Sequence, residues 1–370
     1  MARRLWPSLV FFTVLAAIAV DFWNRPQPIG VDFHTYLAAA RVGLVQGWSH
    51  IYDQGLVAAQ QMSLAPNQPA QPFLSPPPVA WAAAALSALP FEWAYVIWAT
   101  LTMGAFGAAV AWSASDGSPG RALGTVVVIG TVWVLQAVYL GQVVLLVAAA
   151  LLVAWRLLRE EHEVAAGLIL VLVVLKPNTA FLVPACLLAS ARLRTFVTWL
   201  MASAAVAAVA IATIGIPALF AYVGQLQHPP VGTNALTLEA ALGFGWPVVL
   251  VLRVAIVGVV LGAAWWWRAV PGLVIVLGVI GSLLITPYIH LADLCLLAAA
   301  GWIAWHERAH LSWRLPLAAS WFVASPLVDV SGLAPRQNRW PLLEIGWLIA
   351  LLVAGWRAGR HGAAGTRSAH

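Results

Sequence analysis

The chain contains a single lysine, Lys176, which interrupts an apolar run. Pro177 follows it directly, and proline breaks a helix because it has no backbone N–H to donate. A lysine at a helix end can simply extend its amine toward water. An ionisable group within or beside a membrane span is costly, however, and by default marks a functional site. We therefore interpret Lys176 as a functional residue, with a solvated helix-end lysine as the alternative.

Asp32 precedes a segment over residues 33–45 that we expect to form an amphipathic helix. Aspartate is a good N-cap for such a helix, and capping alone would explain its presence. The same helix carries Arg41 and leads toward Tyr52. Its apolar face would lie along a membrane interface. A helix in that place could hold a substrate carried by a lipid.

His290 and Asp293 stand three residues apart at a predicted helix start, and this spacing places them on one face. Such a pair could bind a metal, but the chain supplies no obvious further ligands. Stabilising the charge of an anion, or a structural hydrogen bond, is the favoured reading. We expect neither a metal nor a cofactor.

The elements that must position these residues are membrane helices. Hydrophobic residues make up 62% of the 370 residues and charged residues 9%, against roughly 25% in an ordinary soluble domain. A spanning helix needs about 20 apolar residues, so there is room for roughly ten to thirteen spans. The composition predicts an all-α polytopic membrane protein, with residues 1–370 as a single transmembrane domain. Cys186 and Cys295 lie inside apolar segments, so we assign them to packing.

The net charge of +6 comes from arginines that stand one or two at a time between apolar runs. A nucleic-acid site would need a basic stripe, so these arginines mark the cytoplasmic side and we expect no nucleic-acid partner. With both termini inside, the map gives about twelve crossings. It requires residues 76–112 to cross once, as one span plus a partial helix, and residues 164–190 to form a short hairpin with its tip at Lys176. The reverse, a hairpin first and a single span second, is the alternative.

This map leaves two large loops outside the membrane, residues 23–75 and 217–246, and a cytoplasmic tail over residues 357–370. Residues 5–22, behind two arginines, are read as an uncleaved first span rather than a signal peptide. Asp32, Lys176 and His290 all fall on the exterior side. The exterior turns are therefore where we expect the chemistry.

Several short motifs occur in a particular order. They are Val31–Tyr36, Gly47 with Tyr52 and Asp53, Pro76–Pro78, Gly141–Gln142, Leu175–Pro177, and Pro287–His290 with Asp293. In their order and spacing they resemble glycosyltransferase family 87, of the C-type membrane glycosyltransferase (GT-C) superfamily, from about residue 30 to residue 297. Within it the chain is similar to alpha-mannosyltransferases that use polyprenyl-phosphate mannose.

The chain departs from the family pattern at three places. Leu74–Pro77 stands where Tyr-Pro-Pro is usual, Val143 where an asparagine often follows Gly-Gln, and Ala292 where an aromatic residue usually precedes Asp293. These departures concern the sugar and the acceptor more than the fold.

The resemblance implies a GT-C-like fold and a catalytic carboxylate in the first exterior loop, at the position of Asp32. Asp32 would act as general base on an acceptor hydroxyl and the sugar would transfer with inversion. Lys176 and His290 would bind the phosphate of the donor. The other expected substrate-binding residues are His34, Tyr36, Arg41, Tyr52, Gln142 and Asp293.

The implied partners are a polyprenyl-phosphate sugar donor, a lipid or glycolipid acceptor, and membrane lipids around a monomer. Mannose is the hexose that the resemblance implies by default, and an arabinofuranose donor is the runner-up. The site would face the exterior, periplasmic side of the cell membrane.

Two other classes of function compete with this reading. A transporter or lipid flippase would also have many helices with few intramembrane charges, but it should show inverted repeats and broken helices in matching halves. Here the polar residues gather in the first loop and the exterior turns instead. A membrane scaffold without catalysis would tolerate changes at Asp32, Lys176 and His290.

Overall fold

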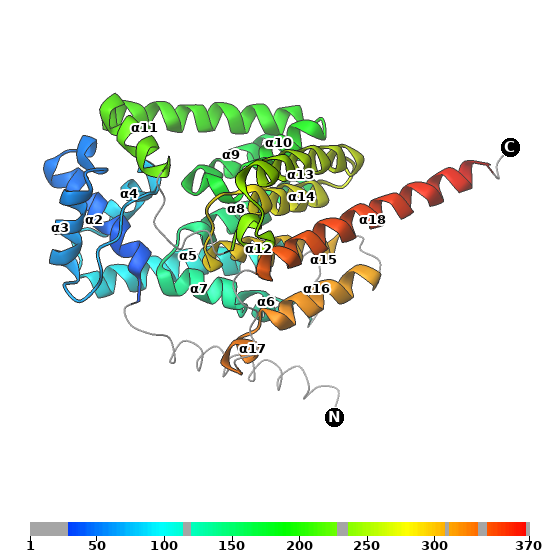
Figure 1. The fold of residues 1–370 in the computed structure, drawn as a ribbon, viewed down its shortest axis with the longest axis horizontal. Helices are drawn as coiled ribbons and strands as arrows, with labels where there is room; N and C mark the ends of the chain where they lie inside the picture. Colours follow the sequence, from blue (N-terminus) through cyan, green and yellow to red (C-terminus); the bar gives the residue numbers. More distant parts are fainter. Residues whose placement is uncertain (1–28, 114–119, 228–235, 308–310, 332–338, 368–370) are drawn as a thin grey trace.

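The computed structural model describes residues 29–113, 120–227, 236–307, 311–331 and 339–367. Every element in these ranges is helical (Figure 1), which confirms the all-α class for this part of the chain. The first span predicted over residues 5–22 lies outside the described residues. In chain order the elements are α2 Val31–Gln46, η1 Trp48–His50, α3 Gln54–Leu64, α4 Pro77–Ala84, α5 Phe91–Ser113, α6 Gly120–Ile129, α7 Val132–Leu140, α8 Val144–Arg159, α9 Glu163–Ile169, η2 Leu170–Leu175, η3 Pro177–Thr179, α10 Leu182–Ala189, α11 Leu193–Gln227, α12 Leu238–Leu242, α13 Trp246–Trp266, α14 Pro271–Ile285, η4 Leu291–Leu294, α15 Cys295–His306, α16 Leu311–Val323, α17 Pro326–Val330 and α18 Trp340–Arg367.

Three of the described helices are long and apolar enough to cross a membrane, judged by length and composition. These are α5 with 23 residues, α11 with 35 and α13 with 21. Shorter apolar helices, including α14, pack against them. The helices support membrane character, whereas the twelve crossings and the GT-C arrangement stay predictions.

The segment over residues 76–112 contains one short and one long helix. α4 has only 8 residues, about 12 Å at 1.5 Å per residue, so it is too short to span a bilayer. Pro90 separates it from α5. The structure therefore matches the expected single span with a partial helix, not a hairpin of two spans.

Residues 163–189 form a hairpin, as predicted. α9 and the 3₁₀ helix η2 lead to Lys176, η3 makes the turn, and α10 returns. A guanidinium nitrogen of Arg192 lies 3.6 Å from a carboxylate oxygen of Glu163. The second arm therefore ends close to the point where the first arm begins. The hairpin therefore carries Lys176 at its tip, far from the arginines at its base.

The first loop folds around α2, which packs mainly on α3 and α4 at one end of the molecule (Figure 1). Nearly every apolar side chain of α2 is buried; only Leu44 and Val45, near its end, are exposed. The prediction that this helix is amphipathic is therefore wrong, whereas its position along the membrane interface stays a prediction. Its surroundings are other helices, because Phe33 and Leu37 are fully enclosed in the core.

α11 bends at Gly215, whose φ of 79° lies outside the helical region, and Pro217 follows inside the helix. After the bend, Tyr222 stacks on Tyr52 with ring centroids 4.8 Å apart, and the Gln225 side chain accepts a 2.8 Å hydrogen bond from Gln54. The end of α11 thus covers the first loop. Part of the predicted second loop is helical, since α11 continues to Gln227 and α12 follows, and α18 extends into the predicted tail.

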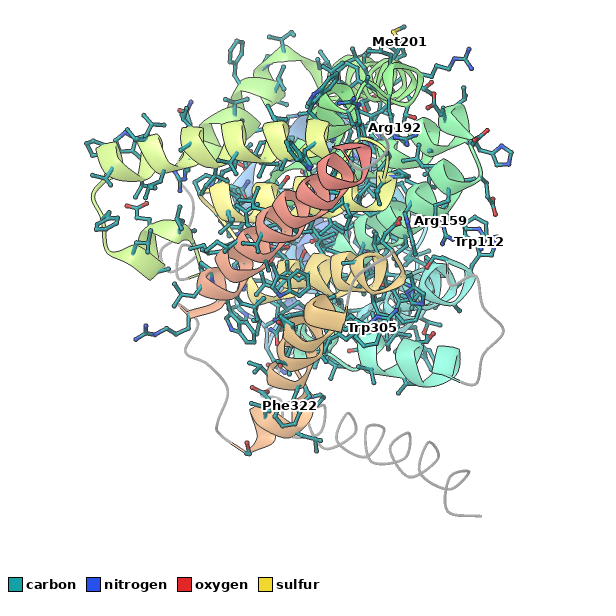
Figure 2. All side chains as sticks on the ribbon, turned by 90° about the vertical axis from the view of Figure 1, so that its right-hand side faces the viewer. Trp112, Arg159, Arg192, Met201, Trp305 and Phe322 are labelled. Atoms are coloured by element: carbon teal, nitrogen blue, oxygen red, sulfur yellow. The ribbon has the colours of Figure 1, made fainter. Side chains whose placement is uncertain are left out.

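The helix α8 has two chemically different ends. Arg156 and Arg159 occupy its last turn, where their positive charges interact favourably with the negative end of the helix dipole. In Figure 2 the right-hand side of Figure 1 faces the viewer, and Arg159 and Arg192 are labelled on that side of the molecule. Gln142 lies just before the other end of α8. Sixteen residues, about 24 Å, separate the arginine end from the polar end.

Candidate active site

A tight approach between α2 and the α7–α8 turn places Asp32 beside Gln142. Gly141 ends α7 with a left-handed φ of 71°, and a Cβ atom at this position would stand 2.6 Å from Cβ of Phe33. Only glycine fits such a place without displacing the helix. The backbone N–H of Gly30 also donates to the carbonyl of Tyr139 at 2.8 Å. These two contacts lock the start of α2 against the end of α7.

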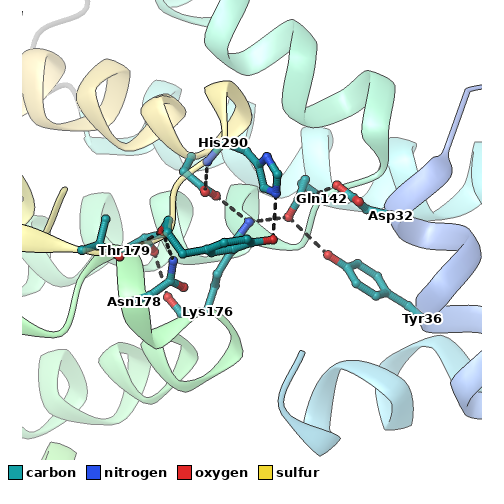
Figure 3. Close-up of polar contacts among 10 residues, drawn as sticks. Asp32, Tyr36, Gln142, Lys176, Asn178, Thr179 and His290 are labelled. Carbon is teal, nitrogen blue, oxygen red and sulfur yellow. Dashed lines mark hydrogen bonds and ion pairs between the residues drawn. The ribbon is translucent and has the colours of Figure 1, made fainter. Parts of the chain in front are cut away.

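Gln142 is the centre of the polar cluster (Figure 3). Its Nε2 donates to Oδ2 of Asp32. Its Oε1 accepts from Nζ of Lys176 at 2.7 Å and from the hydroxyl of Tyr36 at 3.2 Å. The amide is therefore held in one orientation, with its donor toward the carboxylate and its acceptor toward the ammonium. The Asp32 side chain forms no cap with the α2 backbone, so the capping explanation for it does not apply.

Lys176 also forms a buried ion pair with Asp293. Its Nζ lies 2.5 Å from Oδ1 of Asp293, whose side chain is fully buried. The second oxygen, Oδ2, accepts a 2.9 Å hydrogen bond from the backbone N–H of His290. Asp293 thus holds the lysine with one oxygen and the loop before η4 with the other.

His290 and Tyr288 form a second pair in the same loop. The Tyr288 hydroxyl lies 2.7 Å from Nε2 of His290, and the two rings meet edge to face. Asn178, just beyond the hairpin tip, donates to the carbonyl of Tyr288 at 3.1 Å. The hairpin tip and the α14–η4 loop are therefore joined at two points, through Asn178 and through the ion pair of Lys176.

Four side chains of the cluster are only partly buried. Asp32, Lys176, Tyr288 and His290 keep part of their surface accessible, whereas Asp293 has none. Burial raises the pKa of Asp32, and the positive fields of Lys176 and His290 and the hydrogen bond from Gln142 counteract this only in part. A carboxylate with a raised pKa is a stronger base than a solvated one.

Three predicted substrate-binding residues lie away from this cluster and hold the first loop together. Nε2 of His34 lies 2.8 Å from the carbonyl oxygen of Gln61, on α3. Arg41 donates to the carbonyls of Ser87 and Leu89, after α4. The Tyr52 hydroxyl donates to the carbonyl of Ser75 at 2.9 Å. We therefore leave His34, Arg41 and Tyr52 out of the proposal below.

Two residues of the cluster were not among those expected from the sequence, Tyr288 and Asn178. A signal was present, because Tyr288 precedes His290 by two residues and Asn178 follows Lys176 by two. Within the described residues no group of three or more His, Cys, Asp or Glu side chains is arranged to hold a metal ion. The cluster does bring together one partly buried carboxylate, one ammonium group and one imidazole.

Comparison with known proteins places this chemistry in a family. The model of glycosyltransferase family 87 matches residues 73–287, which include Gln142 and Lys176 but not Asp32 or His290. No curated protein and no solved structure matches the chain. Because the match covers more than half of the 370 residues, the chain belongs to glycosyltransferase family 87 and is a membrane glycosyltransferase.

Proposed function

We propose that this protein transfers a hexose, by default mannose, from a polyprenyl-phosphate sugar to a lipid or glycolipid acceptor. The observation that carries the proposal is the meeting of one accessible carboxylate, Asp32, with Lys176 and His290 in a single cluster. A base and a phosphate-binding pair are what displacement of a phosphate by a hydroxyl requires. The exterior membrane face is the proposed location of this cluster.

The proposed reaction is a single displacement. Asp32 takes the proton of an acceptor hydroxyl while that oxygen forms a bond to the anomeric carbon of the sugar. The bond between the anomeric carbon and the phosphate oxygen breaks, and its electron pair leaves with the polyprenyl phosphate. Attack from the side opposite the leaving group inverts the anomeric carbon. One carboxylate suffices, because a phosphate leaves as a stabilised anion and needs charge stabilisation rather than a proton donor.

Lys176 and His290 are the proposed phosphate-binding groups, and Asp293 is a positioning residue. Because Asp293 contacts both the Lys176 ammonium and the backbone of His290, it sets the distance between them. Gln142 then orients the Asp32 carboxylate from the other side. An incoming phosphate competes with Asp293 and Gln142 for the lysine, which couples donor binding to the hydrogen bond on Asp32.

The test is transfer of radiolabelled mannose from polyprenyl phosphate to an extractable lipid by proteoliposomes containing the purified protein. Asp32→Asn should lower the rate by at least about 100-fold, since general-base catalysis contributes roughly 10²–10⁴. Asp53→Asn is the matched control in the same loop. Asp53 caps α3 by accepting from the N–H groups of Gly55 and Leu56, and asparagine caps equally well. The control should keep its activity.

Two results would overturn the proposal. One is the absence of transfer from every polyprenyl-phosphate sugar supplied, with an arabinofuranose donor as the second to be tried. The other is movement of an intact sugar lipid across the vesicle membrane that depends on Asp32 without any glycosidic product, which is the behaviour of a transporter or flippase.

A further inference from the structure

A cavity of about 910 Å³ lies at the arginine end of α8, away from Asp32. Its walls are helix ends: the last turn of α8, the start of α9, the first turn of α11 and the start of α14. Three arginines and three glutamates line it: Arg159, Arg192, Arg194, Glu161, Glu163 and Glu307. The proposed transfer reaction uses none of these residues, so the cavity needs its own explanation.

The surroundings of the cavity are those of a membrane–water boundary. Two of the candidate spans end here, since α11 begins at Leu193 and α13 ends at Trp266. Arginine guanidinium groups also lie over tryptophan rings around this end of the molecule, and tryptophan gathers at such boundaries. These pairs are Arg156 with Trp112, Arg159 with Trp155, Arg268 with Trp265, and Arg314 with Trp305.

One side of the cavity is suited to a phosphate. Nε of Arg192 is buried and has no hydrogen-bond partner among the described residues. A different nitrogen of the same guanidinium group, Nη1, lies 3.6 Å from Oε1 of Glu163, which is longer than a hydrogen bond. Arg194 lies in the first turn of α11, where backbone N–H groups lack helical partners and the helix dipole favours an anion. One planar guanidinium group can donate two parallel hydrogen bonds to two oxygens of a phosphate.

The other side of the cavity is suited to a cation. Glu161 and Glu163 stand at the start of α9, where Glu161 is exposed and Glu163 is half-buried. Glu307 is already engaged, because it accepts a 2.7 Å hydrogen bond from Nε1 of Trp155. The three carboxylates and the three guanidinium groups of the lining carry equal and opposite charge. A phosphate alone would pair with the arginines and leave the negative charges of the glutamates without a positive partner. A phosphate that carries an ammonium group a few bonds away balances both sides.

We propose that this cavity binds a phosphoethanolamine group, with the phosphate at Arg192 and Arg194 and the ammonium at Glu161 and Glu163. The position at the ends of two candidate spans favours a phospholipid headgroup as its source, with acyl chains along α11 and α13. Free phosphoethanolamine has the same chemistry and is the other source to be tested. The proposal does not depend on which sugar the enzyme transfers.

Native mass spectrometry of the purified protein in detergent tests this site. Phosphatidylethanolamine, phosphatidylglycerol with the same acyl chains, and soluble phosphoethanolamine are each titrated. We expect saturable binding of phosphatidylethanolamine, weakened at least tenfold in Arg192→Gln/Arg194→Gln. Arg314→Gln is the matched control, because this arginine lies on the same face over Trp305 but does not line the cavity. Thermal unfolding and size-exclusion profiles show whether each variant is folded.

A second variant separates the two halves of the headgroup. Glu161→Gln/Glu163→Gln should weaken phosphatidylethanolamine binding and leave phosphatidylglycerol binding unchanged or stronger, because only the former carries the ammonium. Competition by soluble phosphoethanolamine would support the site and show that the ligand need not be a lipid. Equal binding of the two lipids to the wild type, or unchanged binding in the folded arginine variant, would refute the proposal. Neither result bears on sugar transfer, so the two proposals fail independently.

Discussion

The surroundings of the Asp32 carboxyl shift its pKa in opposite directions. Burial raises its pKa from an ordinary 3.8, while Lys176, His290 and the hydrogen bond from Gln142 lower it, and the net shift is upward. The folded protein therefore binds a proton at Asp32 more readily than the unfolded chain does. Stability falls as pH rises from the ordinary value through the raised one, because the ionised form is the one that burial disfavours.

This sign predicts that Asp32→Asn stabilises the protein at pH 7 although it lowers the rate of transfer. Asparagine has no charge to desolvate, and its oxygen can still accept the hydrogen bond from Gln142. We expect the thermal midpoint to rise by roughly 2 °C, the shift typical of a gain below 1 kcal/mol. Differential scanning fluorimetry in detergent measures it. A fall in the midpoint would mean that Asp32 serves the structure.

The pH dependence of transfer follows from the same carboxyl. The reaction needs ionised Asp32, so the rate should rise with pH through its raised pKa. Gln142→Met removes the hydrogen bond that lowers this pKa. The acidic limb of the rate profile should therefore move to higher pH in this variant. An unmoved limb would show that another group controls the profile.

At the scale of elements, the close approach of α2 to the end of α7 is what makes the site. Gly141→Ala should destabilise the protein, because a left-handed φ strains an alanine backbone and the added Cβ would clash with Phe33. Gly243 is a matched control: it has a φ of 67° but nothing within 4 Å of an added Cβ. Gly141→Ala should cost about 1–3 kcal/mol more than Gly243→Ala, as measured by chemical unfolding. Equal costs would show that α2 can shift freely.

The Lys176–Asp293 ion pair joins the hairpin of residues 163–189 to η4. Lys176→Met leaves Asp293 buried without its counter-charge, which should cost about 3–5 kcal/mol. Lys176→Met/Asp293→Asn removes both charges and should recover more than half of that loss. A double-mutant cycle on unfolding free energies measures the coupling. Additive effects of the two single substitutions would contradict this role of the pair.

At the scale of the whole molecule, the polar cluster and the arginine end lie at opposite ends of α8. We expect the cluster outside the cell and the arginines inside. Single cysteines test this, because the native Cys186 and Cys295 are buried. A membrane-impermeant maleimide should label Ser49→Cys on intact cells and Arg268→Cys only after permeabilisation. Both positions are exposed, and the reverse pattern would refute the orientation.

Much of the helical plan could be predicted from the sequence because apolar runs and proline breaks are local features. The tip of the hairpin at Lys176, and the single span with a partial helix over residues 76–112, were predicted this way. The burial of α2 was not, because its apolar residues match an interface as well as a core, and only the packing of α3 and α4 decides between them.

The sequence by itself determined the membrane class, since no soluble chain has so few charges, and it determined the residue types able to base-catalyse and bind phosphate. Only the tertiary structure decided which of them meet. Asp32 and Gln142 are 110 residues apart, and helix packing rather than any local pattern joins them. The same packing turns His34 and Arg41 away from the cluster, because a helix presents successive residues to different neighbours.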